Sequence, residues 1–60
     1  MKYYVVKVKG NHIKSFRLNS FGNLTIYYAK HGERIFSTTD QSFATDVASL
    51  LNGEAEEVTE

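Results

Sequence analysis

Few side chains in this sequence have the type and spacing that catalysis requires. His12 and His31 are the only histidines, and neither has a Cys or a carboxylate nearby at metal-ligand spacing. The chain has no Cys, which excludes thiolate metal sites and disulfides. No serine carries a nucleophile signature, and the adjacent Glu56 and Glu57 lie in a segment with the composition of a solvated tail. We therefore expect no enzymatic activity, no cofactor and no metal site.

A different chemistry is available to aromatic side chains that are interleaved with basic ones on a sheet. Nucleic-acid bases stack on Tyr or Phe while Lys and Arg contact phosphates. Tyr, Phe and Arg are also enriched in protein interfaces. Both uses require that the residues share one exposed face. The residues predicted to form this outer face are Tyr3, Val5, Lys7, Ile13, Arg17, Tyr27, Arg34 and Phe36.

Turn sequences divide the first part of the chain into short extended segments. Gly10-Asn11, residues 19–23 and His31-Gly32 are typical of turns that contain positive φ angles. The segments between them are rich in Val, Ile, Tyr, Phe and Thr, as strands are. Short loops favour consecutive hairpins. The pattern predicts a four-stranded antiparallel meander with strands at residues 2–9, 13–19, 24–30 and 33–37.

The period of the apolar residues then changes to that of a helix. Thr38 and Gln41 have the spacing of a capping box, and Gly53 is a natural helix stop. These signals predict a helix over residues 39–52 that packs on one face of the sheet. Its apolar stripe consists of Phe43, Val47, Leu50 and Leu51, with Ala44 and Ala48 beside them.

The C-terminal segment, residues 54–60, carries four acids and two apolar side chains, Ala55 and Val58. It is either an acidic tail or a short fifth strand at the sheet edge. The 60 residues contain no Pro and leave room for one core only. We expect a single α+β domain over residues 1–60.

The predicted register decides which residues form the core. A three-residue loop, Gly10-Asn11-His12, pairs Val6 with Phe16 and keeps Lys7 away from Lys14. A two-residue turn at His31-Gly32 pairs Tyr27 with Phe36. The predicted inner face, covered by the helix stripe, consists of Tyr4, Val6, Val8, Phe16, Leu18, Leu24, Ile26, Tyr28 and Ile35.

One helix cannot cover both faces of a four-stranded sheet, so the outer face is expected to contact water or a partner. The alternative is that sheet twist, long lysine stems or the C-terminal segment cover part of it.

The net charge of zero conceals a segregation along the sequence. Residues 1–32 hold six basic side chains and no acid, whereas residues 33–60 hold one basic side chain and all seven acids. A basic sheet beside an acidic helix and tail would steer a partner or align copies head to tail. Alternatively, the two halves neutralise each other within one copy.

The second half of the chain resembles a known group of small proteins. The residues that carry the likeness are Arg34-Ile35-Phe36-Ser37-Thr38, the Ala-bearing helix, Asn52-Gly53 and the Glu-rich ending with Val58. This ending is similar to that of many short proteins encoded by phages and prophages of Gram-positive bacteria. The resemblance implies an accessory or host-interacting role, an α+β fold whose last residues form a strand, and no catalytic residue.

These features predict a non-enzymatic protein-interaction module. We expect it to form a homo-oligomer through the outer face and to bind a host protein. The alternative is single-stranded nucleic-acid binding by the same face, which the zero net charge disfavours. No apolar run approaches the roughly 20 residues of a membrane span, and lysines interrupt the start of the chain. We expect a cytoplasmic protein without a membrane partner.

Overall fold

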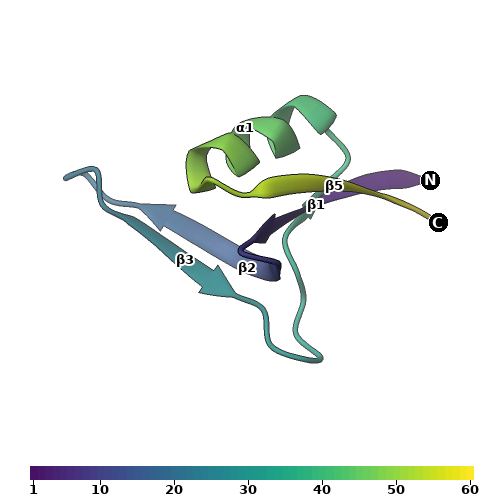
Figure 1. Cartoon of the computed structure of the whole chain (residues 1–60), viewed down its shortest axis with the longest axis horizontal. Coiled ribbons are helices and arrows are strands. Elements are labelled where there is room, and N and C mark those ends of the chain that lie inside the picture. The colour runs from purple at the N-terminus through teal and green to yellow at the C-terminus, as the bar shows by residue number, and fades with distance from the viewer.

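A computed structural model describes all residues, 1–60, as an antiparallel sheet with one helix on one of its faces (Figure 1). This confirms the predicted α+β class. The strand order is β3-β2-β1-β4, and β5 pairs with β1 as well. The elements are β1 (Lys2–Val8), β2 (Asn11–Leu18), β3 (Leu24–Tyr28), β4 (Ser37–Thr38), α1 (Gln41–Leu51) and β5 (Glu54–Thr59).

Strand β1 lies between partners on both sides. On one side it pairs with β5 over six residue pairs, from Lys2 opposite Thr59 to Lys7 opposite Glu54. The C-terminal segment is therefore a strand, the second of the two alternatives given by the sequence. The other side of β1 is divided between two strands. β2 pairs only with Lys7 and Val8, and β4 pairs with Tyr4 and Val5. As Figure 1 shows, the β2–β3 hairpin consequently diverges from the β1–β5 pair.

The first hairpin turns at Lys9 and Gly10. Both residues have positive φ, 54° and 80°, which is the signature of a two-residue type I′ turn. Asn11 therefore lies opposite Val8. The predicted three-residue loop is wrong because Gly10 supplies the second central residue of the turn and not the first residue of a loop.

A β-bulge changes the faces of β2. The β2–β3 register shifts between Ile13 and Ser15, which leaves Lys14 as the extra residue. Because an extra residue reverses the alternation, Ile13 and Phe16 point to the same side. Ile13 is 0% exposed and belongs to the core under the helix. Its predicted place on the outer face is therefore wrong.

The predicted meander is wrong at its fourth strand, because residues 33–37 do not pair with β3 and only Ser37–Thr38 form a strand there. The turn from Lys30 to Glu33 closes with a 3.0 Å backbone hydrogen bond and has a positive φ only at Gly32. This is the pattern of a type II turn, which splays the flanking segments instead of continuing a hairpin. The chain therefore leaves β3, and its next strand, β4, pairs with β1.

Helix α1 begins at the N-cap Asp40, whose side chain accepts a hydrogen bond from the Phe43 backbone N–H. The predicted capping box of Thr38 and Gln41 is therefore absent, and Thr38 instead accepts a hydrogen bond from the backbone N–H of Asp40. The helix ends at Asn52 in the left-handed conformation, as asparagine permits. A Cβ on Gly53 would meet the Lys7 backbone carbonyl, so only glycine fits where β5 begins. The predicted helix is confirmed within two residues at each end.

The core is smaller than predicted. Its buried cluster is bordered by half-buried side chains, among them Phe36, whose ring lies 6.0 Å from Phe16 and 6.1 Å from Phe43, centroid to centroid. Leu18, Tyr28, Phe43 and Leu50, all predicted in the core, are at least two-fifths exposed. The cluster consists of Val6, Val8, Ile13, Val47, Ala48 and Leu51.

Adjacent leucines of α1 test this core. Leu51 is 3% exposed, whereas Leu50 is 50% exposed. Leu51→Ala should lower the free energy of unfolding by about 2–5 kcal/mol, and Leu50→Ala by about half of that or less. Urea unfolding followed by circular dichroism measures both. Equal losses would contradict the orientation of the helix.

Candidate interaction surface

The structure does not assemble the predicted outer face. Val5 is 1% exposed and Ile13 0%, and the half-buried Phe36 packs between Phe16 and Phe43, so these three apolar residues are not available to a partner. Tyr3 and Lys7 are half-buried on β1, and Arg34 is exposed in the segment between β3 and β4. Of the eight predicted residues, only Arg17 and Tyr27 lie together on an exposed surface.

The burial of Val5 has a local cause. Val5 lies on the face of β1 opposite to Val6, away from the helix-covered core. Its cross-strand neighbour is Glu56, which forms a 3.1 Å ion pair with Lys7, two residues along the same face. The Lys7 and Glu56 side chains therefore flank Val5 on this face, which is consistent with the alternative that lysine stems and the C-terminal segment cover part of it.

The exposed surface of interest belongs to the β2–β3 hairpin. The register places Ser15 opposite Tyr27 and Arg17 opposite Thr25. All four side chains are exposed, and they share the face that points away from α1. An open hollow of about 490 Å³ lies on this face and continues to the hairpin loop. Its lining residues are Arg17, Leu18, Asn19, Asn23, Thr25 and Tyr27.

The outer edge of β3 is the second feature of the hairpin. β3 pairs only with β2, so its other edge has free backbone groups. Natural edge strands are protected from further pairing by charges, by Pro or by bulges. β3 has none of these, since residues 24–28 are uncharged and the bulge lies in β2. By contrast, the opposite edge strand, β5, carries three glutamates.

The hairpin loop displays an aromatic side chain. Asn19 Oδ1 accepts hydrogen bonds from the backbone N–H groups of Phe21 and Asn23, both at 2.9 Å. Gly22 completes the loop with a positive φ. Phe21 is 88% exposed on this ordered loop. The sequence identified the turn but not Phe21 as a surface group, although an apolar residue within a turn sequence was a usable signal.

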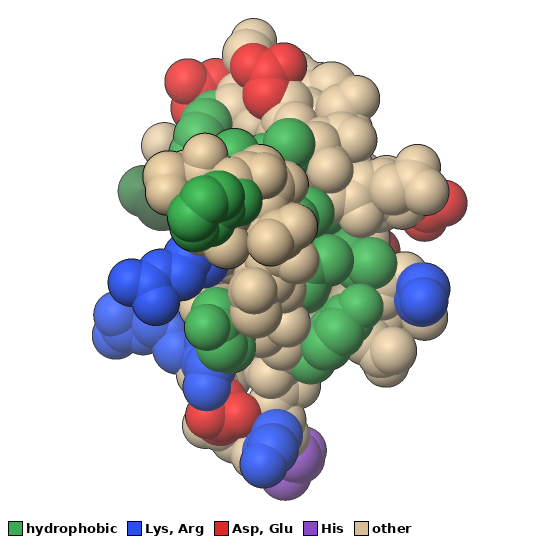
Figure 2. Space-filling model, turned by 90° about the vertical axis from the view of Figure 1, so that its left-hand side faces the viewer, with side chains coloured by type: hydrophobic (Ala, Val, Ile, Leu, Met, Phe, Trp, Pro, Cys, Tyr) green, Lys and Arg blue, Asp and Glu red, His purple; other side chains and the backbone are tan.

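In Figure 2, which looks from the side of the hairpin loop, several basic side chains lie together on the left flank and others lie at the right edge and at the bottom, whereas acidic ones lie at the top, at the right and beside the basic ones at the bottom. Three ion pairs form, through Lys2, Lys7 and Lys14, and Arg17 takes part in none of them. The guanidinium of Arg17 is therefore free to bind an anionic group.

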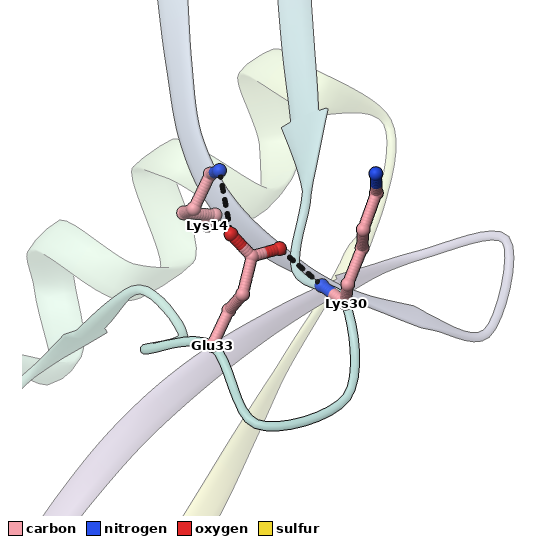
Figure 3. A network of polar contacts seen from close by, with 3 residues as sticks. All are labelled: Lys14, Lys30 and Glu33. Atoms are coloured by element: carbon pink, nitrogen blue, oxygen red, sulfur yellow. Dashed lines mark hydrogen bonds and ion pairs between the residues drawn. The ribbon is translucent and has the colours of Figure 1, made fainter.

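The bulged residue Lys14 is held by Glu33 (Figure 3). The Glu33 carboxylate accepts a 2.8 Å hydrogen bond from the Lys30 backbone N–H and a 3.1 Å one from Lys14 Nζ. These two contacts, the backbone one first, lower the pKa of Glu33 from 4.5. The contact joins the Lys30–Glu33 turn to the bulge in β2.

The histidines border a different hollow, of about 330 Å³, where the first hairpin turn meets residues 29–33. Nδ1 of His12 is buried there without a hydrogen-bond partner. No group of three or more His, Asp or Glu side chains is arranged to hold a metal ion.

Comparison of the chain with protein-family models, curated proteins and solved structures gives no match. The single helix is too short to cross a lipid bilayer.

Two phenylalanines test the revised surface. Phe36→Glu places a carboxylate between Phe16 and Phe43 and should lower the free energy of unfolding by about 1–3 kcal/mol. The matched change Phe21→Glu at the exposed loop should alter it by no more than about 0.5 kcal/mol. Thermal and urea unfolding report both values. If Phe36→Glu is as stable as Phe21→Glu, Phe36 lies on an outer face after all.

The Glu33 contact predicts a pH dependence. Because folding lowers the pKa of this carboxyl, its contribution to stability is present above pH 4.5 and is lost as the pH falls through the lower folded value. The carboxyl carbon of Glu33 should titrate below 4.5 in carbon-detected NMR. Lys14→Met should bring the midpoint only part of the way back, because the Lys30 N–H remains. A midpoint at or above 4.5 in the unmodified chain would contradict the contact.

Proposed function

We propose that this chain is a small non-enzymatic protein-interaction module that self-associates through the outer edge of β3. The observation that carries the proposal is the difference between the two edges of the sheet. β3 offers five uncharged residues without a protective feature, whereas β5 carries three glutamates whose charges would have to be desolvated if another strand paired with it. The expected contact is therefore a strand edge and not the broad sheet face that the sequence suggests.

A symmetric pair of copies follows from this geometry. Two antiparallel β3 strands pair over their full length when the twofold axis passes through Ile26. Leu24 of one copy then lies opposite Tyr28 of the other, and Thr25 lies opposite Tyr27. Opposite residues stay on the same face, so the half-buried Leu24 and Ile26 and the 40% exposed Tyr28 gain apolar neighbours.

The energetic terms favour a modest affinity. Cross-strand apolar and aromatic pairs contribute about 0.2–1 kcal/mol each, in addition to the backbone hydrogen bonds. No charge of β3 has to be desolvated, because the strand has none. The nearest positive charge on the neighbouring strand, Arg17, is one strand spacing away from the edge. Because β3 has only five residues, we expect association in the micromolar range or weaker.

Head-to-tail assembly by opposite charges has less support. The acids of β5 already face lysines of β1, with Lys2 paired to Glu57 and Lys7 to Glu56. These ion pairs neutralise much of the charge difference between the two halves of the sequence within one copy. The β3 edge therefore accounts for self-association better than an electrostatic contact.

An extended segment of a host protein is a further partner of the same chemistry, since it would add to the β3 edge as a strand. The resemblance to phage and prophage proteins agrees with such a partner. Such a segment would compete with self-association for the β3 edge. This competition would distinguish strand addition from binding at another surface.

A threonine on each sheet edge provides a matched test. Thr25→Asp introduces an acid into the exposed β3 edge, and Thr59→Asp makes the same change on β5. Sedimentation equilibrium up to millimolar concentration should show a dimer for the unmodified chain and for Thr59→Asp. Thr25→Asp should raise the dimer dissociation constant at least about tenfold, because the charge must be desolvated and β3 pairs less well.

Isotope-filtered NMR on a mixture of labelled and unlabelled copies provides a direct check, with an expected contact between Leu24 and Tyr28 of different copies. A monomer throughout the concentration range would overturn the proposal. An equal effect of both substitutions would do so as well, because the β3 edge would then have no special role.

A further inference from the structure

We infer that the exposed face of the β2–β3 hairpin binds single-stranded nucleic acid, with Tyr27 stacking on a base and Arg17 contacting a phosphate. This goes beyond self-association and does not require it. The two residues come from neighbouring strands and line one open hollow of about 490 Å³.

The positions of the two side chains fit this chemistry. Arg17 lies opposite Thr25, two residues from Tyr27 on the same face, so Arg17 and Tyr27 are diagonal neighbours. A base over the tyrosine ring would leave its phosphate near the guanidinium. Single-strand binding proteins combine the same two contacts, aromatic stacking and an arginine beside the backbone.

The remaining lining of the hollow is polar and suits base edges. Asn19 uses its side-chain oxygen to hold the loop, which fixes the position of Asn23 through the backbone N–H of that residue. The side-chain amide of Asn23 has no partner within the chain and is free to donate and accept at a base.

Local electrostatics favours an anionic ligand although the net charge is zero. No acid occurs in residues 1–32, which include the whole hairpin. Lys14 is compensated by Glu33, but Arg17 forms no ion pair. Tyr27 is 43% exposed, and its ring makes no aromatic pair within the chain. Binding should therefore be weak, salt-dependent and confined to this face.

Self-association would enlarge the site, a step that rests on the proposed function. Pairing of two β3 strands places Thr25 of each copy beside Tyr27 of the other. The two hollows then share one face, with two tyrosines and two arginines. An oligonucleotide of about 12 residues should consequently bind the dimer more tightly than one of about four.

Adjacent tyrosines supply the matched variants. Tyr27 and Tyr28 have similar exposure but lie on opposite faces of β3. Fluorescence anisotropy with labelled oligo-dT and oligo-U of about four residues, which one copy can bind alone, should show that Tyr27→Ala weakens binding at least about tenfold, whereas Tyr28→Ala does not. Tyr27→Phe keeps the ring and should retain most of the affinity. Circular dichroism confirms that each variant is folded.

The arginine contact has its own readout. Arg17→Gln should reduce the slope of log affinity against log salt concentration by about one, and Arg34→Gln should leave it unchanged. Loss of one phosphate contact explains this change, whereas a purely structural effect would not alter the slope.

Three results would overturn the inference: no salt-dependent binding of either oligonucleotide, equal losses for Tyr28→Ala and Tyr27→Ala, or equal competition by duplex DNA of the same length. The outcome is separable from self-association. A dimer that binds no oligonucleotide refutes only the nucleic-acid site, and a monomer that binds the short oligonucleotide refutes only the dimer.

Discussion

β1 pairs along its length with β5 on one side and divides its other side between β2 and β4. Since one stretch of backbone cannot pair twice on the same side, β2 must leave β1 for β4 to enter. The divergence starts two residue pairs after the type I′ turn at Lys9 and Gly10. The β2–β3 hairpin is thus directed away from the β1–β5 pair, and its outer edge has no neighbour.

The division of β1 between β2 and β4 also explains how α1 covers the core with few side chains. The helix lies against β1 and β5, where the buried valines of β1 are located. The bulge at Lys14 turns Ile13 toward this region, and Phe36 fills the space between β2 and the helix. Further along the hairpin, Leu18 lies beyond the helix and is half exposed. The part of the sheet that is free to bind a partner is therefore the part that the helix cannot reach.

The features that depend on local patterns were predictable from the sequence. The helix, the three hairpin strands and the core residues Val6, Val8, Val47 and Leu51 follow from periodicity and turn composition. The features that depend on which face of the sheet a residue occupies were not predictable. A bulge at Lys14 reverses the face of Ile13 relative to Phe16, and a type II turn at Gly32 changes the strand partner of the segment after it. Neither feature has a strong sequence signature. This is why Ile13 and Phe36 were assigned to the wrong face. Arg17 and Tyr27 lie in the regular part of the β2–β3 hairpin after the bulge, and both are on an exposed face, as expected.

Charge segregation in the sequence does not become charge segregation in space wherever antiparallel pairing joins distant segments. β5 returns the acidic end of the chain to β1, so that the N-terminal ammonium contacts the Glu60 carbonyl at 3.0 Å and two lysines of β1 face glutamates. The hairpin is excluded from this neutralisation because β5 does not extend to it. Glu33 is the one acid that forms an ion pair there, and it binds Lys14 at the bulge. Arg17 consequently keeps an uncompensated charge beside an uncharged edge strand, so the proposed edge pairing and the proposed nucleic-acid contact lie at the same end of the molecule.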